Sequence, residues 1–175
     1  MNTLETERLV LRPPVVDDLD AFAKMWADAK ALKDIPIEPQ SRGQSWGGLM
    51  RIAGCWALKG YGQWMVLDKT SGKFIGQAGC FDALRDFGPD FYNHREAGWV
   101  FTPAASGKGL ATRAMSASLG WMYLQSYGSH TVCMIGAGHS ASIRVAEKCG
   151  YTLLREAEDE HGAIRLMSRK KPAVT

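Results

Sequence analysis

The segment from Glu96 to Thr112 reads EAGWVFTPAASGKGLAT and decides the fold. Its opening, Glu96 to Phe101, is typical of a β-strand, which Pro103 ends. A glycine-rich turn follows at Ser106 to Gly109. Beyond the turn, apolar residues recur at helical spacing, namely Leu110, Ala114, Ala117, Trp121 and Leu124. The segment therefore predicts a strand, a glycine turn and a helix.

The turn is suited to an anion. Backbone N–H groups at the start of a helix have no partner inside it and carry the positive end of the helix dipole. A turn without bulky side chains at that place therefore suits a phosphate group, and residues 106–112 have this composition. Glycine can also serve backbone geometry alone. The turn by itself leaves a phosphate site and a purely structural connection both open.

Two common phosphate-binding motifs do not fit. In a P-loop, Thr102 would replace the first glycine, and Gly109 would replace the residue that coordinates magnesium. In a dinucleotide fingerprint, Thr112 would occupy the third position, where helix packing favours glycine or alanine. We therefore expect neither a P-loop protein nor a Rossmann enzyme.

Strand and helix patterns alternate along the rest of the chain, which predicts a mixed α/β domain. Helices are expected over Leu19–Trp26, behind Asp17 as a cap, over Trp46–Ala57 and over Ser140–Cys149. Strands are expected at Thr6–Arg12, Trp64–Leu67, Phe74–Phe81, Thr131–Ile135, Tyr151–Arg155 and Ala163–Ser168.

Composition indicates one soluble domain. The chain has 175 residues, 46% of them hydrophobic, and a formal net charge of +3. We expect residues 1–170 to form one domain and residues 171–175 a short C-terminal tail. No apolar run approaches the ~18 residues of a membrane span, and the basic residues are scattered. We therefore expect a cytoplasmic protein that binds neither membrane nor nucleic acid.

The cysteines do not indicate a metal site. Cys55, Cys80, Cys133 and Cys149 include no C-x-x-C pair and have no histidine at zinc-finger spacing. We expect reduced, mostly buried thiols and no bound metal.

The glycine turn resembles the acyl-CoA signature of the GCN5-related N-acetyltransferases (GNAT), which reads [QR]-x-x-G-x-[GA] at the start of the central helix. Gly109 and Ala111 match it, while Ser106 replaces the usual Gln or Arg. Four further segments are similar to the branch that includes the ribosomal-protein alanine acetyltransferases: Thr6–Arg12, Gly72–Gly79, Glu96–Phe101 and Ser142–Tyr151. The resemblance implies an α/β GNAT fold, with a single mixed central sheet of about seven strands, about four flanking helices, and splayed fourth and fifth strands.

The resemblance also implies acetyl-CoA as co-substrate, with no metal. Its pantetheine arm is expected to pair with backbone of the fourth strand, and its pyrophosphate to lie on the turn. His139 stands where the family usually has Asn. The residues implied for the cofactor are Trp99, Val100, Phe101, Ser106, Gly107, Lys108, Gly109, Leu110, Ala111, Thr112, His139 and Ser142.

Catalytic roles follow from the same resemblance. Acetyl transfer to an amine needs a neutral amine and a proton for the departing thiolate. Glu96 matches the residue thought to take the ammonium proton, and Ser142 matches the residue assigned to protonate the thiolate. A solvent-facing glutamate and a helix-capping serine are the alternatives. Many relatives use a tyrosine as the acid, but Ala146 occupies that position here.

Two functions remain open. The first is direct transfer of an acetyl group to a primary amine, on a protein N-terminus or a small molecule. The alternative is a catalytically impaired acyl-CoA-binding sensor or partner-binding module, motivated by Ser106, His139 and Ala146. The family implies that residues 28–46 and 82–94 select the acceptor. A homodimer is possible, and aromatic residues in the second loop either line the acceptor site or anchor the loop.

Overall fold

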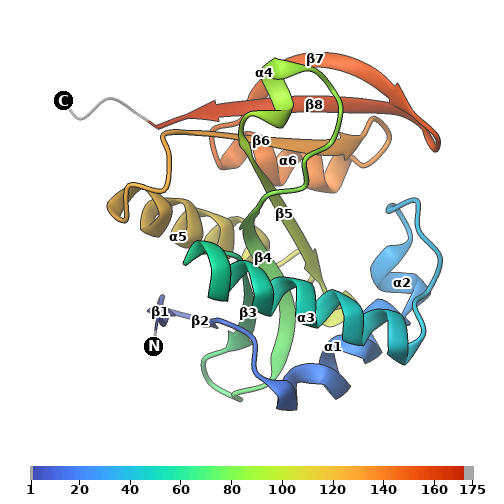
Figure 1. The fold of residues 1–175 in the computed structure, drawn as a ribbon. Coiled ribbons are helices and arrows are strands. Elements are labelled where there is room, and N and C mark those ends of the chain that lie inside the picture. Colours follow the sequence, from blue (N-terminus) through green and yellow to red (C-terminus); the bar gives the residue numbers. More distant parts are fainter. Residues whose placement is uncertain (1, 172–175) are drawn as a thin grey trace.

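The computed structural model describes residues 2–171 as one eight-stranded mixed sheet with helices on both faces (Figure 1). The strand order is β1-β2-β3-β4-β5-β6-β8-β7. The strands are β1 (Leu4–Glu5), β2 (Leu9–Arg12), β3 (Gln63–Asp68), β4 (Phe74–Phe81), β5 (Arg95–Phe101), β6 (His130–Gly136), β7 (Thr152–Asp159) and β8 (Gly162–Lys170). The predicted α/β class and single mixed sheet are confirmed.

The helices are α1 (Leu19–Trp26), α2 (Ala29–Leu32), α3 (Arg42–Lys59), α4 (Pro89–Tyr92), α5 (Leu110–Leu124) and α6 (Ser140–Lys148), with two 3₁₀ turns at Val16–Asp18 and Pro103–Ala105. The strand–turn–helix segment thus becomes β5, the glycine turn and α5. The sequence did not predict the short helices α2 and α4, because one helical turn shows too little periodicity.

The first predicted strand begins differently from expectation. Residues 4–5 and 9–12 form two strands, so the sheet has eight strands rather than about seven. Asp17 is also not the cap of α1. Asp18 is the residue immediately before that helix. Its carboxylate accepts from Arg12 Nη2 at 2.6 Å and from Val15 N–H at 2.8 Å, and it makes no capping hydrogen bond to α1.

The sheet splays where the predicted fourth and fifth strands, β5 and β6, begin to separate. They are the sheet's parallel pair, and their register contains only Arg95↔Thr131 and Glu96↔Val132. From Ala97 to Phe101, β5 pairs with β4 on one side and, among residues 2–171, has no strand partner on the other. The predicted splay is therefore confirmed, and Glu96 lies at its apex.

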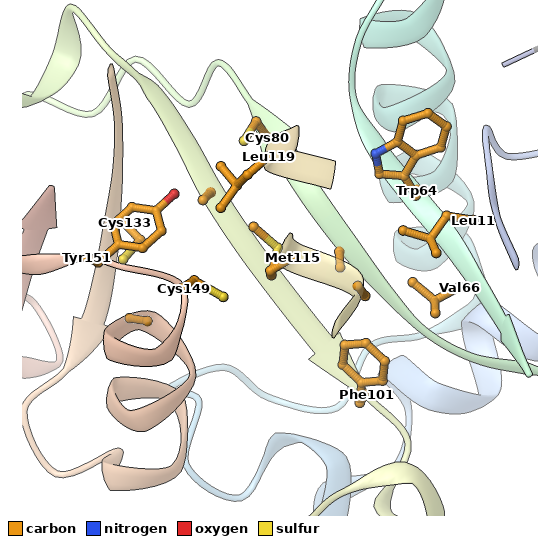
Figure 2. Close-up of a cluster of buried hydrophobic side chains, with 14 of the residues drawn as sticks. Leu11, Trp64, Val66, Cys80, Phe101, Met115, Leu119, Cys133, Cys149 and Tyr151 are labelled. Atoms are coloured by element: carbon orange, nitrogen blue, oxygen red, sulfur yellow. The ribbon is translucent and has the colours of Figure 1, made fainter. Parts of the chain in front are cut away.

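Different helices cover the two faces of the sheet. On one face, Met115 and Leu119 of α5 pack with β3 residues Trp64 and Val66, in the core shown in Figure 2. On the other face, α1 and α3 contribute Phe22, Leu49 and Ile52, which pack on Met65. Successive β3 side chains therefore face opposite cores, as the pleat requires.

Helix α3 is longer than the predicted Trp46–Ala57. Ser41 caps its start by accepting from Gln44 N–H at 3.2 Å, and Gln44 reciprocates through the Ser41 N–H. Gly60, at φ +75°, ends it in the left-handed conformation. No helix within residues 2–171 is long and apolar enough to cross a membrane. The predicted tail lies outside the described residues except for Lys171.

Candidate active site

A cavity of about 360 Å³ lies between β5, the glycine turn, the start of α5 and α6. Its lining includes nearly all residues expected to contact the cofactor: Trp99, Val100, Phe101, Ser106, Gly107, Gly109, Leu110, Ala111, Thr112, His139 and Ser142. Lys108 is the exception. The side chain of Lys108 is exposed and does not line the cavity, so Lys108 contributes only its backbone to the turn.

The glycine turn presents a row of free donors. Within residues 2–171, the N–H groups of residues 107–112 have no backbone acceptor, and the first bond of the helix runs from Arg113 N–H to Gly109 C=O. Gly107 and Gly109 adopt φ of +75° and +72°, and a Cβ built on either would meet no atom within 4 Å. An open cradle of N–H groups at a helix start fits a pyrophosphate.

The free edge of β5 borders the same cavity. Trp99, Val100 and Phe101 lie beyond the last pairing with β6, so their backbone faces the cavity on that side. An unpaired strand edge can accept a ligand that is itself a chain of amides, as the pantetheine arm of CoA is. The donors of the turn and the edge of β5 are therefore suited to different parts of one CoA molecule.

A second cavity, of about 840 Å³, adjoins the first. Trp99, Val100, His139 and Ser142 line both, so the two cavities meet at the splay. The larger cavity is lined by residues from α1, α3, β3, β4, β5, β6, α6, β7 and β8 and from loops between them. Both segments expected to select the acceptor contribute, through residues 33–36 and through Asp82, Ala83 and Arg85.

The loop aromatics do not line the larger cavity. Phe91 is 2% exposed, and its ring lies edge-on to that of Phe87 at 5.6 Å between centroids. Both pack on Val132, Ile164 and Leu166. Phe87 and Phe91 therefore anchor the β4–β5 loop to the core.

Glu96 is buried at the apex of the splay and lines the larger cavity. Its side chain is 7% exposed, and its carboxylate accepts from Arg85 Nε at 2.8 and 3.1 Å. Burial raises the pKa of Glu96, and the positive charge of Arg85 partly opposes that shift. Glu96 is not a solvent-facing residue, and a carboxylate with a raised pKa is a stronger base.

Ser142 and His139 contact one another at the junction of the cavities. Ser142 Oγ lies 3.2 Å from His139 Nε2, and Asp34 Oδ2 lies 3.8 Å from the same nitrogen. His139 is the residue immediately before α6, and neither Ser140 nor Ser142 caps the helix. Burial lowers the pKa of His139, which favours a neutral imidazole. No sequence spacing indicated this grouping, because Asp34 comes from a distant loop.

Cys149 offers no nucleophile. It is 6% exposed within the core, and burial raises the pKa of its thiol. Within residues 2–171, no three His, Cys, Asp or Glu side chains are grouped as metal ligands.

Sequence reasoning missed two glutamines in the larger cavity. Gln63 of β3 and Gln77 of β4 are 9% and 4% exposed. Trp26 Nε1 donates to Gln77 Oε1 at 3.1 Å, and Gln77 Nε2 donates to Gln63 Oε1 at 3.1 Å. For Gln77 the available signal was a polar residue inside a predicted strand, since buried polar side chains are uncommon. Gln63 lies just before the predicted strand Trp64–Leu67 and gave no such signal.

Comparisons with known proteins point to one family. Residues 8–152 match the family model described as "Acetyltransferase (GNAT) domain". The chain is 31% identical over 117 residues to the uncharacterized protein YkkB of Bacillus subtilis, and the match covers 64% of each chain. A putative GNAT-family acetyltransferase from Bordetella pertussis has 31% identity and a TM-score of 0.87, over 97% of this chain and 99% of that one.

More distant structures share the fold. RimL, a ribosomal L7/L12 α-N-protein acetyltransferase solved with coenzyme A, has 14% identity and a TM-score of 0.79, over 97% of this chain and 98% of that chain. AAC(6')-Ib, solved with paromomycin and acetyl-CoA, has 15% identity and a TM-score of 0.75, over 94% of each chain. At these identities the likeness extends to the fold alone.

Proposed function

The chain belongs to the GNAT acetyltransferase family, and we propose that it transfers an acetyl group from acetyl-CoA directly to a primary amine. The observation that carries this proposal is the meeting of the two cavities at the splay. A cradle of backbone donors lies on one side, and a buried carboxylate lies on the other. The smaller cavity takes CoA, and the larger one takes the amine.

The turn and the edge of β5 hold the cofactor. The N–H groups of residues 107–112 bind its pyrophosphate, and the backbone of Trp99 to Phe101 binds its pantetheine arm. The backbone donors do not depend on Ser106, so loss of the usual Gln or Arg is tolerated. When bound, acetyl-CoA supplies the acetyl group as a thioester.

Glu96 acts as the general base. It removes a proton from the ammonium group of the acceptor, directly or through water, and so frees the nitrogen lone pair for attack on the thioester carbonyl. Its raised pKa suits this role, and Arg85 keeps it ionised for the next turnover. A bond from nitrogen to the acetyl carbon forms, and the bond from carbon to sulfur breaks.

Ser142 gives its hydroxyl proton to the departing thiolate, and His139 supports it. The hydroxyl oxygen takes up the second proton that the acceptor nitrogen loses as the amide forms. In the tautomer with hydrogen on Nε2, the imidazole donates a hydrogen bond to Ser142 Oγ across 3.2 Å and stabilises negative charge on that oxygen during the transfer. The negative charge of Asp34 at 3.8 Å favours that tautomer. The pair replaces the tyrosine that many relatives use.

A protein N-terminus or a small molecule serves as acceptor. The fold carries both activities in other proteins, since RimL acts on a ribosomal protein and AAC(6')-Ib was solved with paromomycin. The larger cavity, about 840 Å³, is large enough for either kind of group.

The test separates an enzyme from a binding module. Calorimetric titration with acetyl-CoA measures the cofactor site, and release of free thiol is then followed with N-terminal peptides, polyamines and aminoglycosides. Binding together with thiol release supports the proposal. Binding without transfer to any amine supports the acyl-CoA-binding module, and absence of binding at millimolar ligand contradicts both.

A further inference from the structure

Three polar side chains that the proposed reaction does not use form a hydrogen-bonded chain in the wall of the larger cavity. They are Trp26 of α1, Gln77 of β4 and Gln63 of β3. Both glutamines are more than nine-tenths buried. A buried amide has a cost unless its donors and acceptors are used, so the direction of this chain matters.

The indole fixes that direction. Trp26 Nε1 can only donate, so Gln77 must turn its oxygen toward the indole and its NH₂ toward Gln63. Gln63 must then accept through Oε1, and it does so at 3.1 Å. The NH₂ group of Gln63 remains at the end of the chain, and within residues 2–171 it has no hydrogen-bond partner.

The free NH₂ belongs to a residue that lines the same cavity as the proposed base. A Cβ built on Gly98 would lie 3.5 Å from Gln63 Nε2 and 3.0 Å from Phe81 Cε1, so the amide and the ring of Phe81 both border Gly98. Gly98 and Glu96 both line the cavity. As alternate residues of β5 they point to the same face, about 7 Å apart along the strand.

We propose that Gln63 determines acceptor specificity by donating a hydrogen bond to an oxygen of the acceptor. The preferred acceptor is then an amine that also carries a carbonyl or hydroxyl oxygen within the reach of Gln63. A peptide N-terminus offers a backbone carbonyl, and an amino sugar offers a ring hydroxyl. This inference rests on the proposed function, because Glu96 sets the position of the amine.

The physical reason for selectivity is the cost of an unpaired buried amide. A site built to hydrogen-bond a substrate oxygen rejects an analogue that lacks it, since the amide loses water and gains no partner. An unbranched alkylamine of the same length would enter the cavity and leave the Gln63 NH₂ unpaired.

The first experiment compares kcat/KM for a tripeptide amide, an amino sugar and an unbranched alkylamine. The wild type is expected to prefer an oxygen-bearing amine by about 100-fold or more. Gln63→Leu should lose most of that preference. A comparison of the two oxygen-bearing substrates shows whether Gln63 binds a carbonyl or a hydroxyl oxygen. Equal discrimination by wild type and Gln63→Leu would overturn the inference.

A polarity swap sharpens this comparison. Gln63→Glu keeps the length of the side chain and still accepts from Gln77, but places an oxygen where the NH₂ was. It should favour an alkyl diamine over the oxygen-bearing amines by about 10-fold relative to wild type. Gln125→Glu makes the same chemical change at an exposed position outside both cavities and should leave every ratio unchanged.

A second readout does not require turnover. In ¹⁵N-labelled protein loaded with CoA, the Gln63 side-chain amide is the pair of signals missing from Gln63→Glu. These signals should shift with the tripeptide amide or the amino sugar and not with the alkylamine. A shift without acetyl transfer by the wild type would contradict the proposed function and support this inference. Turnover with no shift, or with equal shifts for all three amines, would contradict this inference alone.

Discussion

The two cavities, the smaller proposed for the cofactor and the larger for the acceptor, are built from different parts of the chain. The first contains the free backbone donors of one continuous turn, residues 107–112, whereas the second is lined by residues from nine helices and strands. A backbone site needs only a local conformation, while a side-chain site needs long-range register. Substitutions should therefore affect the first mainly by filling it and the second by removing functional groups.

Filling the backbone cradle should have the largest effect. Gly109→Trp places an indole where the pyrophosphate binds, and we expect loss of acetyl-CoA affinity of at least about 1,000-fold by calorimetry. Gly72→Trp is the matched control, because Gly72 also has positive φ (+67°) and open space around its Cβ, in the β3–β4 turn. Both should incur similar backbone strain. Equal affinities in the two variants would show that the turn is not the cofactor site.

Removal of the proposed base, Glu96, should have the second-largest effect. Glu96→Gln keeps shape but cannot accept the ammonium proton, so kcat should fall on the order of 1,000-fold with acetyl-CoA affinity retained. In the wild type, kcat/KM should fall toward acid with a midpoint above the ordinary carboxyl value of 4.5, since burial raises the pKa of Glu96. Glu96→Gln should lose that acid limb. An unchanged profile would exclude Glu96 as the base.

The hydroxyl–imidazole pair should act as one unit. Ser142→Ala should lower kcat on the order of 100-fold, with less effect on CoA binding. If His139 works through Ser142, adding His139→Ala to Ser142→Ala should cost much less than His139→Ala alone. Stopped-flow thiol release from the four proteins of this cycle measures the coupling. Fully additive losses in kcat would show that Ser142 and His139 act independently.

Removal of the positive charge of Arg85 beside Glu96 should have a moderate effect. Arg85 stabilises the carboxylate form of Glu96, so Arg85→Met should raise the pKa of Glu96 further and leave more of it protonated. The acid limb of kcat/KM should move to higher pH, with about a threefold loss at pH 6. Arg51→Met removes another cation that lines the cavity and does not contact Glu96. A limb that moves equally in both variants would contradict the specific role of Arg85.

The smallest effect should come from a side chain of the turn itself. Lys108 is exposed and does not line the cofactor cavity, so Lys108→Ala should change acetyl-CoA affinity by no more than about twofold. Titration under identical salt conditions checks this. A loss above tenfold would mean that the cofactor site depends on side-chain charge as well as on backbone donors.

Sequence reasoning was most successful where the signal was local. The strand, turn and helix around Glu96 to Leu124 were predicted as they stand, and the resemblance correctly implied the splay at that strand. It failed for α2 and α4, which have only four residues each, and for the start of the chain, where β1 precedes the predicted strand Thr6–Arg12 and only Leu9–Arg12 of that strand forms. These elements depend on neighbours in space more than on their own periodicity.

The candidate site divides in the same way. The sequence identified Glu96, but it did not identify Arg85 as its partner, because the pair forms only when the β4–β5 loop folds back. It named His139 and Ser142 as separate candidates. It did not predict their contact or the position of Asp34 beside His139. Of the two buried glutamines, Gln77 was passed over as an ordinary strand residue, and Gln63 lay just outside the predicted strand Trp64–Leu67.

What the sequence determined alone is the family, the order of the main elements and the cradle of backbone donors. Every residue carries an N–H group, and a short glycine turn before a helix is enough to leave these groups free. What only the tertiary structure decided is the environment of Glu96, the Ser142–His139 pair and the free amide of Gln63. These depend on sheet register and on loops that converge from distant positions, and no local pattern encodes that convergence.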